Sequence, residues 1–139
     1  MIDLARRAVA CERWQWLPGM LARHPNWRAF RVANVGLTGM RGACRYASPM
    51  GGVEWAVVAL PVPTSSDVLP DLTDPATLGC LHALVREAWG DPRATLYPME
   101  ADGSGGWLGW GLVLSDGRGV GPFAEAEAEA LVFALEAAP

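Results

Sequence analysis

The chain has 139 residues, of which 51% are hydrophobic and 19% are charged. This composition indicates one globular domain that can fold without disulfides or metals, and it excludes an intrinsically disordered chain. No apolar run approaches the ~18 residues of a membrane-spanning helix, and the first residues lack the pattern of a signal peptide, so we expect a soluble, cytosolic protein with no membrane association.

Charged residues are unevenly distributed along the chain. Residues 1–45 contain eight arginines and two acids, a net charge of +6, whereas residues 46–139 contain three arginines and thirteen acids, a net charge of −10. The total of −4 argues against a general nucleic-acid-binding protein. The basic N-terminal third is compatible with a local anion-binding site.

The first elements are predicted from short patterns. Residues 3–11, DLARRAVAC, have apolar residues at helical spacing and predict an amphipathic helix. Residues 13–16, RWQW, alternate with a period of two and predict a strand with both tryptophans on one face. The following LPGM, residues 17–20, predicts a turn.

Three strands are expected next, over residues 27–37, 41–47 and 52–61, separated by short glycine-bearing gaps. This spacing predicts an antiparallel meander. Residues 55–60, WAVVAL, are apolar on both faces and indicate a central strand. The proline-rich residues 61–73 predict a loop.

The most clearly defined element begins at Asp74. Asp74 is a good N-cap, Pro75 suits the first helical position, and Gly90 followed by Asp-Pro predicts the end of the helix. Its expected buried stripe comprises Leu78, Leu81, Leu84, Val85, Ala88 and Trp89. Gly79 inside this helix costs about 1 kcal/mol relative to alanine, which is tolerable if another part of the chain packs closely there.

Two more strands and a helix complete the chain. Residues 93–99 and 106–115 predict strands, and residues 123–138 predict a helix. The helix is expected to bury Ala128, Leu131, Val132 and Leu135. The order of elements predicts a single α+β domain, residues 1–139, whose mostly antiparallel sheet is covered by helices.

No catalytic or metal-binding signature is present. His24 and His82 have no serine or cysteine partner in a recognisable motif, and we expect each to be a surface or half-buried residue. The glycine-rich residues 102–106 and 117–121 lack the Gly-Lys-Ser/Thr ending of a P-loop. Three acids near helix ends are interpreted as solvated termini: Asp71, Asp74 and Asp91.

The three cysteines predict no metal site. Cys11, Cys44 and Cys80 contain no CxxC pair, so they are expected to be free or buried thiols. We therefore predict no metal and no cofactor.

Seven tryptophans are the unusual feature of the composition. Trp14 and Trp16 beside arginines are suited to stacking on a base and binding its phosphate. A strand over residues 107–114 places two glycines beside Trp107, which suits close approach of another backbone or a flat ligand. Core packing and a protein interface are the alternative roles. The predicted ligand-binding residues are Arg13, Trp14, Trp16, Arg41, Arg45 and Trp107.

Three segments carry a resemblance to known sequences. LARRAVACERWQWLPGM (4–20), LPDLTDPATLGCLHALVREAWGDP (69–92) and AEAEALVFALEAAP (126–139) resemble a group of small proteins encoded by phages and prophages of GC-rich bacteria. Ala124 departs from this group, which carries a threonine-type cap there. The resemblance implies a phage accessory protein acting in the host cytosol, and it implies no catalytic residue.

Three functions follow as hypotheses. The first is a non-enzymatic, plausibly counter-defence protein that sequesters a nucleotide-like small molecule. The alternative is a protein-interaction module that blocks a host protein through tryptophan anchors and an acidic surface. An enzyme with a site assembled from dispersed residues around His24 or His82 is the third. Self-association is expected in the first two cases, because exposed strand edges and apolar patches tend to be buried against another copy of the chain.

Overall fold

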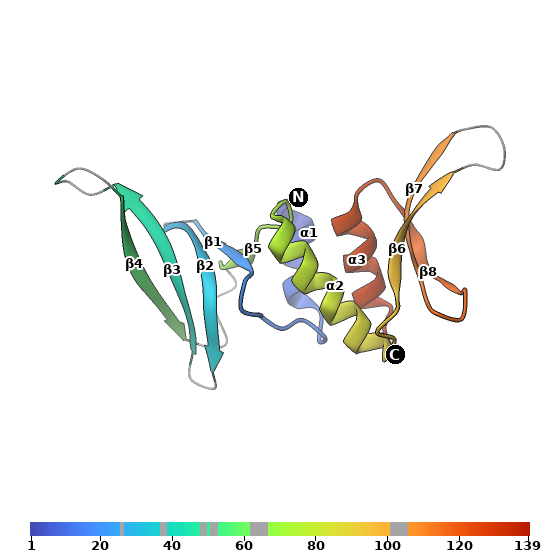
Figure 1. Cartoon of the computed structure of the whole chain (residues 1–139), viewed down its shortest axis with the longest axis horizontal. Coiled ribbons are helices and arrows are strands. Elements are labelled where there is room, and N and C mark those ends of the chain that lie inside the picture. The colour runs from blue at the N-terminus through green and yellow to red at the C-terminus, as the bar shows by residue number, and fades with distance from the viewer. Residues whose placement is uncertain (26, 37–38, 48–49, 51–52, 62–66, 101–105) are drawn as a thin grey trace.

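Three helices lie between two antiparallel sheets in the computed structural model (Figure 1). The structure describes residues 1–139 except 26, 37–38, 48–49, 51–52, 62–66 and 101–105. The helices are α1 (Ile2–Ala10), α2 (Pro75–Trp89) and α3 (Glu127–Glu136). The predicted α+β class is confirmed, with the strands divided between two sheets that flank the helices.

The first sheet has the strand order β4-β3-β2-β1-β5. Its strands are β1 (Leu21–His24), β2 (Trp27–Gly36), β3 (Gly39–Ala47), β4 (Val53–Pro61) and β5 (Leu69–Pro70). The meander β2-β3-β4 is as predicted. Strands β1 and β5 were not predicted because they are short, and β5 lies within the segment interpreted as a loop. Alternation along β2 buries Phe30 and Val32.

The prediction that residues 55–60 form a central strand is wrong for the single chain. Strand β4 is at the edge of the sheet, with β3 as its neighbour, and Val57 is 80% exposed. Apolar residues on both faces describe what a strand's side chains contact, but they do not determine how many strands pair with its backbone.

The predicted strand at residues 13–16 is also wrong. Residues 14–17 form an irregular segment between α1 and β1. Trp14 and Trp16 are half-buried against the core, and their rings meet edge to face with centroids 5.5 Å apart. An extended segment crossing the core gives the same alternation as a strand without needing a paired neighbour. The predicted turn follows, with Gly19 at φ 97°.

Helix α2 has the predicted boundaries. Asp74 accepts a hydrogen bond from the backbone N–H of Thr77 at 2.8 Å, and Gly90 ends the helix at φ 61°. Leu81, Leu84 and Val85 are buried. Gly79 is exposed, and a Cβ there would meet nothing within 4 Å. Among the described residues, nothing packs closely enough at Gly79 to account for a glycine there.

The second sheet is the meander β6-β7-β8, formed by β6 (Thr95–Glu100), β7 (Trp107–Val113) and β8 (Gly119–Ala124). The first two strands were predicted. Strand β8 was not, because its last residues were assigned to the final helix, which begins only at Glu127 with no side-chain cap.

The chain's own β8 fills the space beside the glycines of β7. A Cβ at Gly109 (φ 127°) would lie 2.5 Å from the carbonyl oxygen of Ala124, and one at Gly111 would lie 3.3 Å from the ring of Phe123. The close approach expected at these glycines is therefore made by a neighbouring strand.

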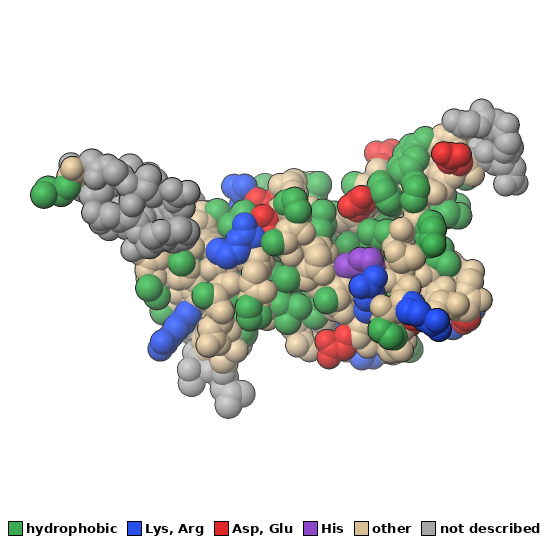
Figure 2. All heavy atoms as spheres, viewed as in Figure 1, with side chains coloured by type: hydrophobic (Ala, Val, Ile, Leu, Met, Phe, Trp, Pro, Cys, Tyr) green, Lys and Arg blue, Asp and Glu red, His purple; other side chains and the backbone are tan. Residues whose placement is uncertain are grey.

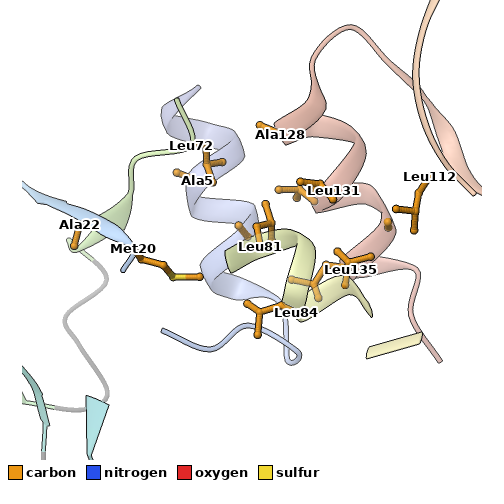
Figure 3. Packing of buried hydrophobic residues seen from close by; sticks show 14 of the residues in the cluster. Ala5, Met20, Ala22, Leu72, Leu81, Leu84, Leu112, Ala128, Leu131 and Leu135 are labelled. Atoms are coloured by element: carbon orange, nitrogen blue, oxygen red, sulfur yellow. The ribbon is translucent and has the colours of Figure 1, made fainter. Parts of the chain in front are cut away.

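One continuous core joins the layers. Figure 3 shows Leu81 and Leu84 of α2 beside Leu131 and Leu135 of α3, with Ala5 of α1 in the same layer. Met20 just before β1, Ala22 of β1 and Leu112 of β7 extend this cluster to both sides (Figure 3). The four residues that α3 was expected to bury are buried: Ala128, Leu131, Val132 and Leu135.

Two glycine-to-alanine substitutions should change stability in opposite directions. Gly79→Ala adds a methyl group in open space on a helix and should raise the free energy of unfolding by about 1 kcal/mol. In Gly109→Ala the alanine would have to adopt the positive φ of Gly109, and its Cβ would collide with β8. This substitution should lower the free energy of unfolding by more than about 2 kcal/mol. Urea denaturation of both variants measures the two changes, and changes of the same sign would contradict this account.

Candidate functional site

Asp74 is the centre of a cluster of hydrogen-bonded polar groups at the start of α2. Its Oδ2 accepts hydrogen bonds from Nη1 of Arg31 at 2.6 Å and from the Thr77 hydroxyl at 2.9 Å, and its Oδ1 accepts one from Nη2 of Arg31 at 2.9 Å. The hydrogen bonds from Arg31, together with those from Thr77, lower the pKa of Asp74 to about 2 despite its burial. Arg31 also donates to the carbonyl oxygen of Gly19 at 2.8 Å.

A second carboxylate, Asp71, is held in the same way. Its Oδ2 accepts from Nε and Nη2 of Arg23 at 2.8 and 2.6 Å, and its Oδ1 accepts from the N–H and hydroxyl of Thr73. Burial acts to raise the pKa of Asp71, but the hydrogen bonds from Thr73 and Arg23 outweigh it, so the pKa is lowered.

The interpretation of these two acids as solvated termini is wrong. The Asp71 and Asp74 side chains are only 8% and 13% exposed. Each is neutralised by an arginine from a strand of the first sheet, so both act as structural anchors. Asp91 is more accessible, and it accepts hydrogen bonds from the N–H groups of Arg93 and Ser115.

A groove of about 600 Å³ lies beside Asp71, between α1, β1 and β5. Arg6, Arg23, His24 and Thr73 line it together with apolar residues of α1 and β5. The Thr73 hydroxyl donates to a carboxylate that Arg23 already neutralises. This arrangement orders the chain before α2, and it is not that of a hydroxyl activated by a histidine base.

His82 is half-buried, as predicted. Its Nε2 lies 3.1 Å from the carbonyl oxygen of Ala94, which also accepts from Nε of Arg86 at 2.8 Å. Burial and the neighbouring Arg86 lower the pKa of His82. Within the described ranges no three His, Cys, Asp or Glu side chains are grouped as metal ligands, and the three cysteines are free thiols.

Three of the predicted ligand-binding residues lie on one segment after α1. The Arg13 guanidinium donates to the carbonyl oxygen of Pro139 and lines a cavity of about 490 Å³. Arg7 lines the same cavity, but it forms a 2.5 Å ion pair with Glu136. Trp14 and Trp16 pack against each other and the core, and the buried Nε1 of Trp14 has no hydrogen-bond partner among the described residues.

The other three predicted residues lie elsewhere. Arg41 and Arg45 are on β3, where Arg41 is exposed and the side chain of Arg45 is outside the described part. Trp107 is on β7, across the helical layer from β3 (Figure 1). Trp14 and Trp16 thus contact each other, whereas neither lines the cavity beside Arg13, and Trp107 lies on a different sheet.

Among the described residues, four of the large exposed apolar side chains belong to the second sheet. Four residues there are each between 50% and 53% exposed, and we call them the apolar surface: Tyr97, Trp107, Leu108 and Phe123. This surface includes both faces of the sheet, because Tyr97 and Phe123 lie on the face of Gly111, whereas Trp107 meets Trp110, whose side chain points to the opposite face. The Trp107 ring is supported by Trp110, edge to face at 5.7 Å between centroids. The ring of Phe123 lies against Gly111, which is directly opposite Tyr97 in the register of β6 and β7.

Acidic side chains border the apolar surface. Glu100 is opposite Trp107 in the strand register, and Glu125 follows β8 directly; both are exposed. Figure 2 shows acidic groups beside the hydrophobic surface at this end of the molecule. Of the four apolar residues, sequence reasoning identified only Trp107. The apolar residues on both faces of 106–115 could have indicated an exposed apolar side chain on this strand. Phe123 was not recognised as part of the sheet because it was assigned to the final helix.

No protein-family model, curated protein or solved structure matches this chain. No helix in the part of the chain that the structure describes is both long and apolar enough to cross a membrane.

Replacing Asp74 should give a stability loss that depends on pH. Because the folded pKa of about 2 is below the ordinary value of 3.8, the ion pair stabilises the fold fully above pH 4 and progressively less as pH falls through 2. Asp74→Asn keeps a capping side chain but removes the charge, and should cost about 1–2 kcal/mol at pH 7. This difference should shrink toward pH 2 in urea denaturation.

Asp3→Asn is the matched control. Its carboxylate is 94% exposed and pairs with Arg6 at 3.4 Å, so the substitution should change stability by less than about 0.5 kcal/mol. An equal loss for Asp74→Asn at pH 7 and pH 2 would show that the charge of Asp74 is not what stabilises the fold.

Proposed function

We propose that this protein is a non-catalytic interaction module that docks a protein partner on the apolar surface of β6–β8. The observation that supports this most strongly is the grouping of Tyr97, Trp107, Leu108 and Phe123, all about half exposed, on one small sheet. Large apolar side chains left exposed on one element are typical of an interaction site. Tryptophan and tyrosine are also the residues that contribute most at protein interfaces.

The chemistry of the partner follows from the border of this surface. Exposed carboxylates at Glu100 and Glu125 favour a partner whose apolar patch is surrounded by lysine or arginine. The aromatic residues supply the buried contact area, and the carboxylates supply long-range attraction that salt screens.

The resemblance to phage and prophage proteins supports a setting for this binding. We infer an accessory protein that acts in the host cytosol by occupying a surface of a host protein. Sequestration of a nucleotide-like molecule stays the alternative, and it rests on Arg13, Trp14 and Trp16, with the cavity that Arg13 lines as its support.

Substituting the aromatic residues of the apolar surface should abolish retention of the protein partner. From host lysate, the tagged wild-type chain should retain a discrete protein at about 0.1 M salt and release it as salt rises. The double variant Trp107→Ser/Phe123→Ser should retain at least about tenfold less of it, since two aromatic anchors are lost. Quantitative mass spectrometry of the retained proteins gives the ratio, and circular dichroism checks that the variant is folded.

Ile2→Ser is the matched control, because Ile2 is 64% exposed but lies on α1. It should retain the same protein as the wild type. If the double variant and Ile2→Ser retain identical sets, the apolar surface is not the docking site. If native mass spectrometry instead finds a nucleotide-sized mass that Trp14→Ala abolishes, the sequestration alternative replaces this proposal.

A further inference from the structure

The free edge of β4 is long and regular. Strand β4 has nine residues, Val53–Pro61, and pairs with β3 along its whole length without a bulge. No strand among the described residues pairs with its other side. That side therefore presents a row of backbone N–H and C=O groups, which is a template for adding another strand.

The other sheet edges contain proline, whereas the described β4 has proline only at its last position. Strand β5 has only two residues and ends in Pro70, while β6 contains Pro98 and β8 contains Pro122. Proline has no N–H and interrupts the row of donors on an edge. In β4 the proline is the last residue, and residues 55–60 carry no charge.

The side chains of β4 fit a central position better than an edge. Val58 packs against the core, whereas Val57 points away from it and is 80% exposed. A strand that is apolar on both faces is typical of the middle of a sheet. A further strand paired with β4 would satisfy the free backbone groups of its edge and would give the exposed Val57 an apolar cross-strand neighbour.

We propose that this strand is β4 of a second copy of the chain, paired antiparallel across a two-fold axis. Antiparallel pairing of identical strands is self-complementary, as a two-fold interface requires. The two five-stranded sheets then form one continuous sheet in which both copies of β4 are central.

The length of β4 determines the register of this pairing. Val57 is the middle of the nine residues, so full overlap places Val57 opposite Val57 of the second copy, with Cβ atoms about 5 Å apart. In this register Glu54, the only charged residue of β4, is opposite Leu60. The charged position is therefore not opposite its own copy across the axis.

The dimer has a consequence for the proposed function. Strand β4 and the second sheet lie at opposite ends of the molecule (Figure 1). Pairing through β4 leaves the apolar surface exposed at both ends of an elongated dimer. Provided that the apolar surface is the docking site, the dimer is bivalent, and it gains avidity for a partner that is itself multimeric.

Lysine substitutions distinguish the two surfaces in sedimentation velocity. The wild type should dimerise, and Val57→Lys should weaken the dimer by at least about tenfold, because two ammonium groups become direct neighbours across the axis. Leu108→Lys makes the same chemical change on the apolar surface and should leave the dimer intact. A wild type that is monomeric at every concentration would overturn the proposal, as would a dimer that Leu108→Lys dissociates and Val57→Lys does not.

Cysteine pairs test the register. Under mild oxidation, Val57→Cys should form a disulfide-linked dimer, whereas Ala59→Cys should not, because its two copies would be separated by about 13 Å along the strands. The wild type controls for the native thiols. Equal crosslinking of both variants would refute pairing centred on Val57. The Val57→Lys monomer should still retain the protein partner, so loss of the dimer and loss of docking are separate results.

Discussion

The bidentate ion pair between Arg31 and Asp74 is the interaction on which the arrangement of the layers depends. Arg31 projects from β2 and Asp74 caps α2, so one contact fixes the first sheet against the start of the central helix. Thr77 strengthens this junction, since its hydroxyl donates to Asp74 and accepts from the N–H of Leu21. The charges are neutralised within a part-buried cluster, where a carboxylate without a partner would be costly.

Anchoring at this junction leaves the far parts of both sheets uncovered by helices. Helix α3 packs on the second sheet and α1 contacts β5, but the β3–β4 hairpin and the β6–β7 hairpin extend away from the helical layer at opposite ends (Figure 1). The free backbone edge of β4 and the apolar surface of β6–β8 are the two consequences. One offers hydrogen bonds to a strand, and the other offers aromatic side chains, so they suit different partners.

Local signals predicted the elements that depend on local physics. The cap at Asp74, the stop at Gly90 and the apolar spacing in α2 involve groups within a few residues of one another, and all three were correct. The strand expected at 13–16 was wrong because alternation does not require a paired neighbour. Of the candidate site residues, Trp107 was identified as exposed surface chemistry, but its separation from Trp14 could not be foreseen, because nothing local specifies the distance between two sheets.

By itself the sequence determined the α+β class, the helix boundaries of α2, the buried face of α3 and the excess of acids in the C-terminal part. These properties follow from spacing and composition along the chain. Only the tertiary structure decided that the strands form two sheets, that Arg31 and Arg23 neutralise Asp74 and Asp71, and that β4 is an edge. Each of these is a pairing between residues far apart in the chain, and such pairings depend on which backbone edges and charges the folded layers bring into contact.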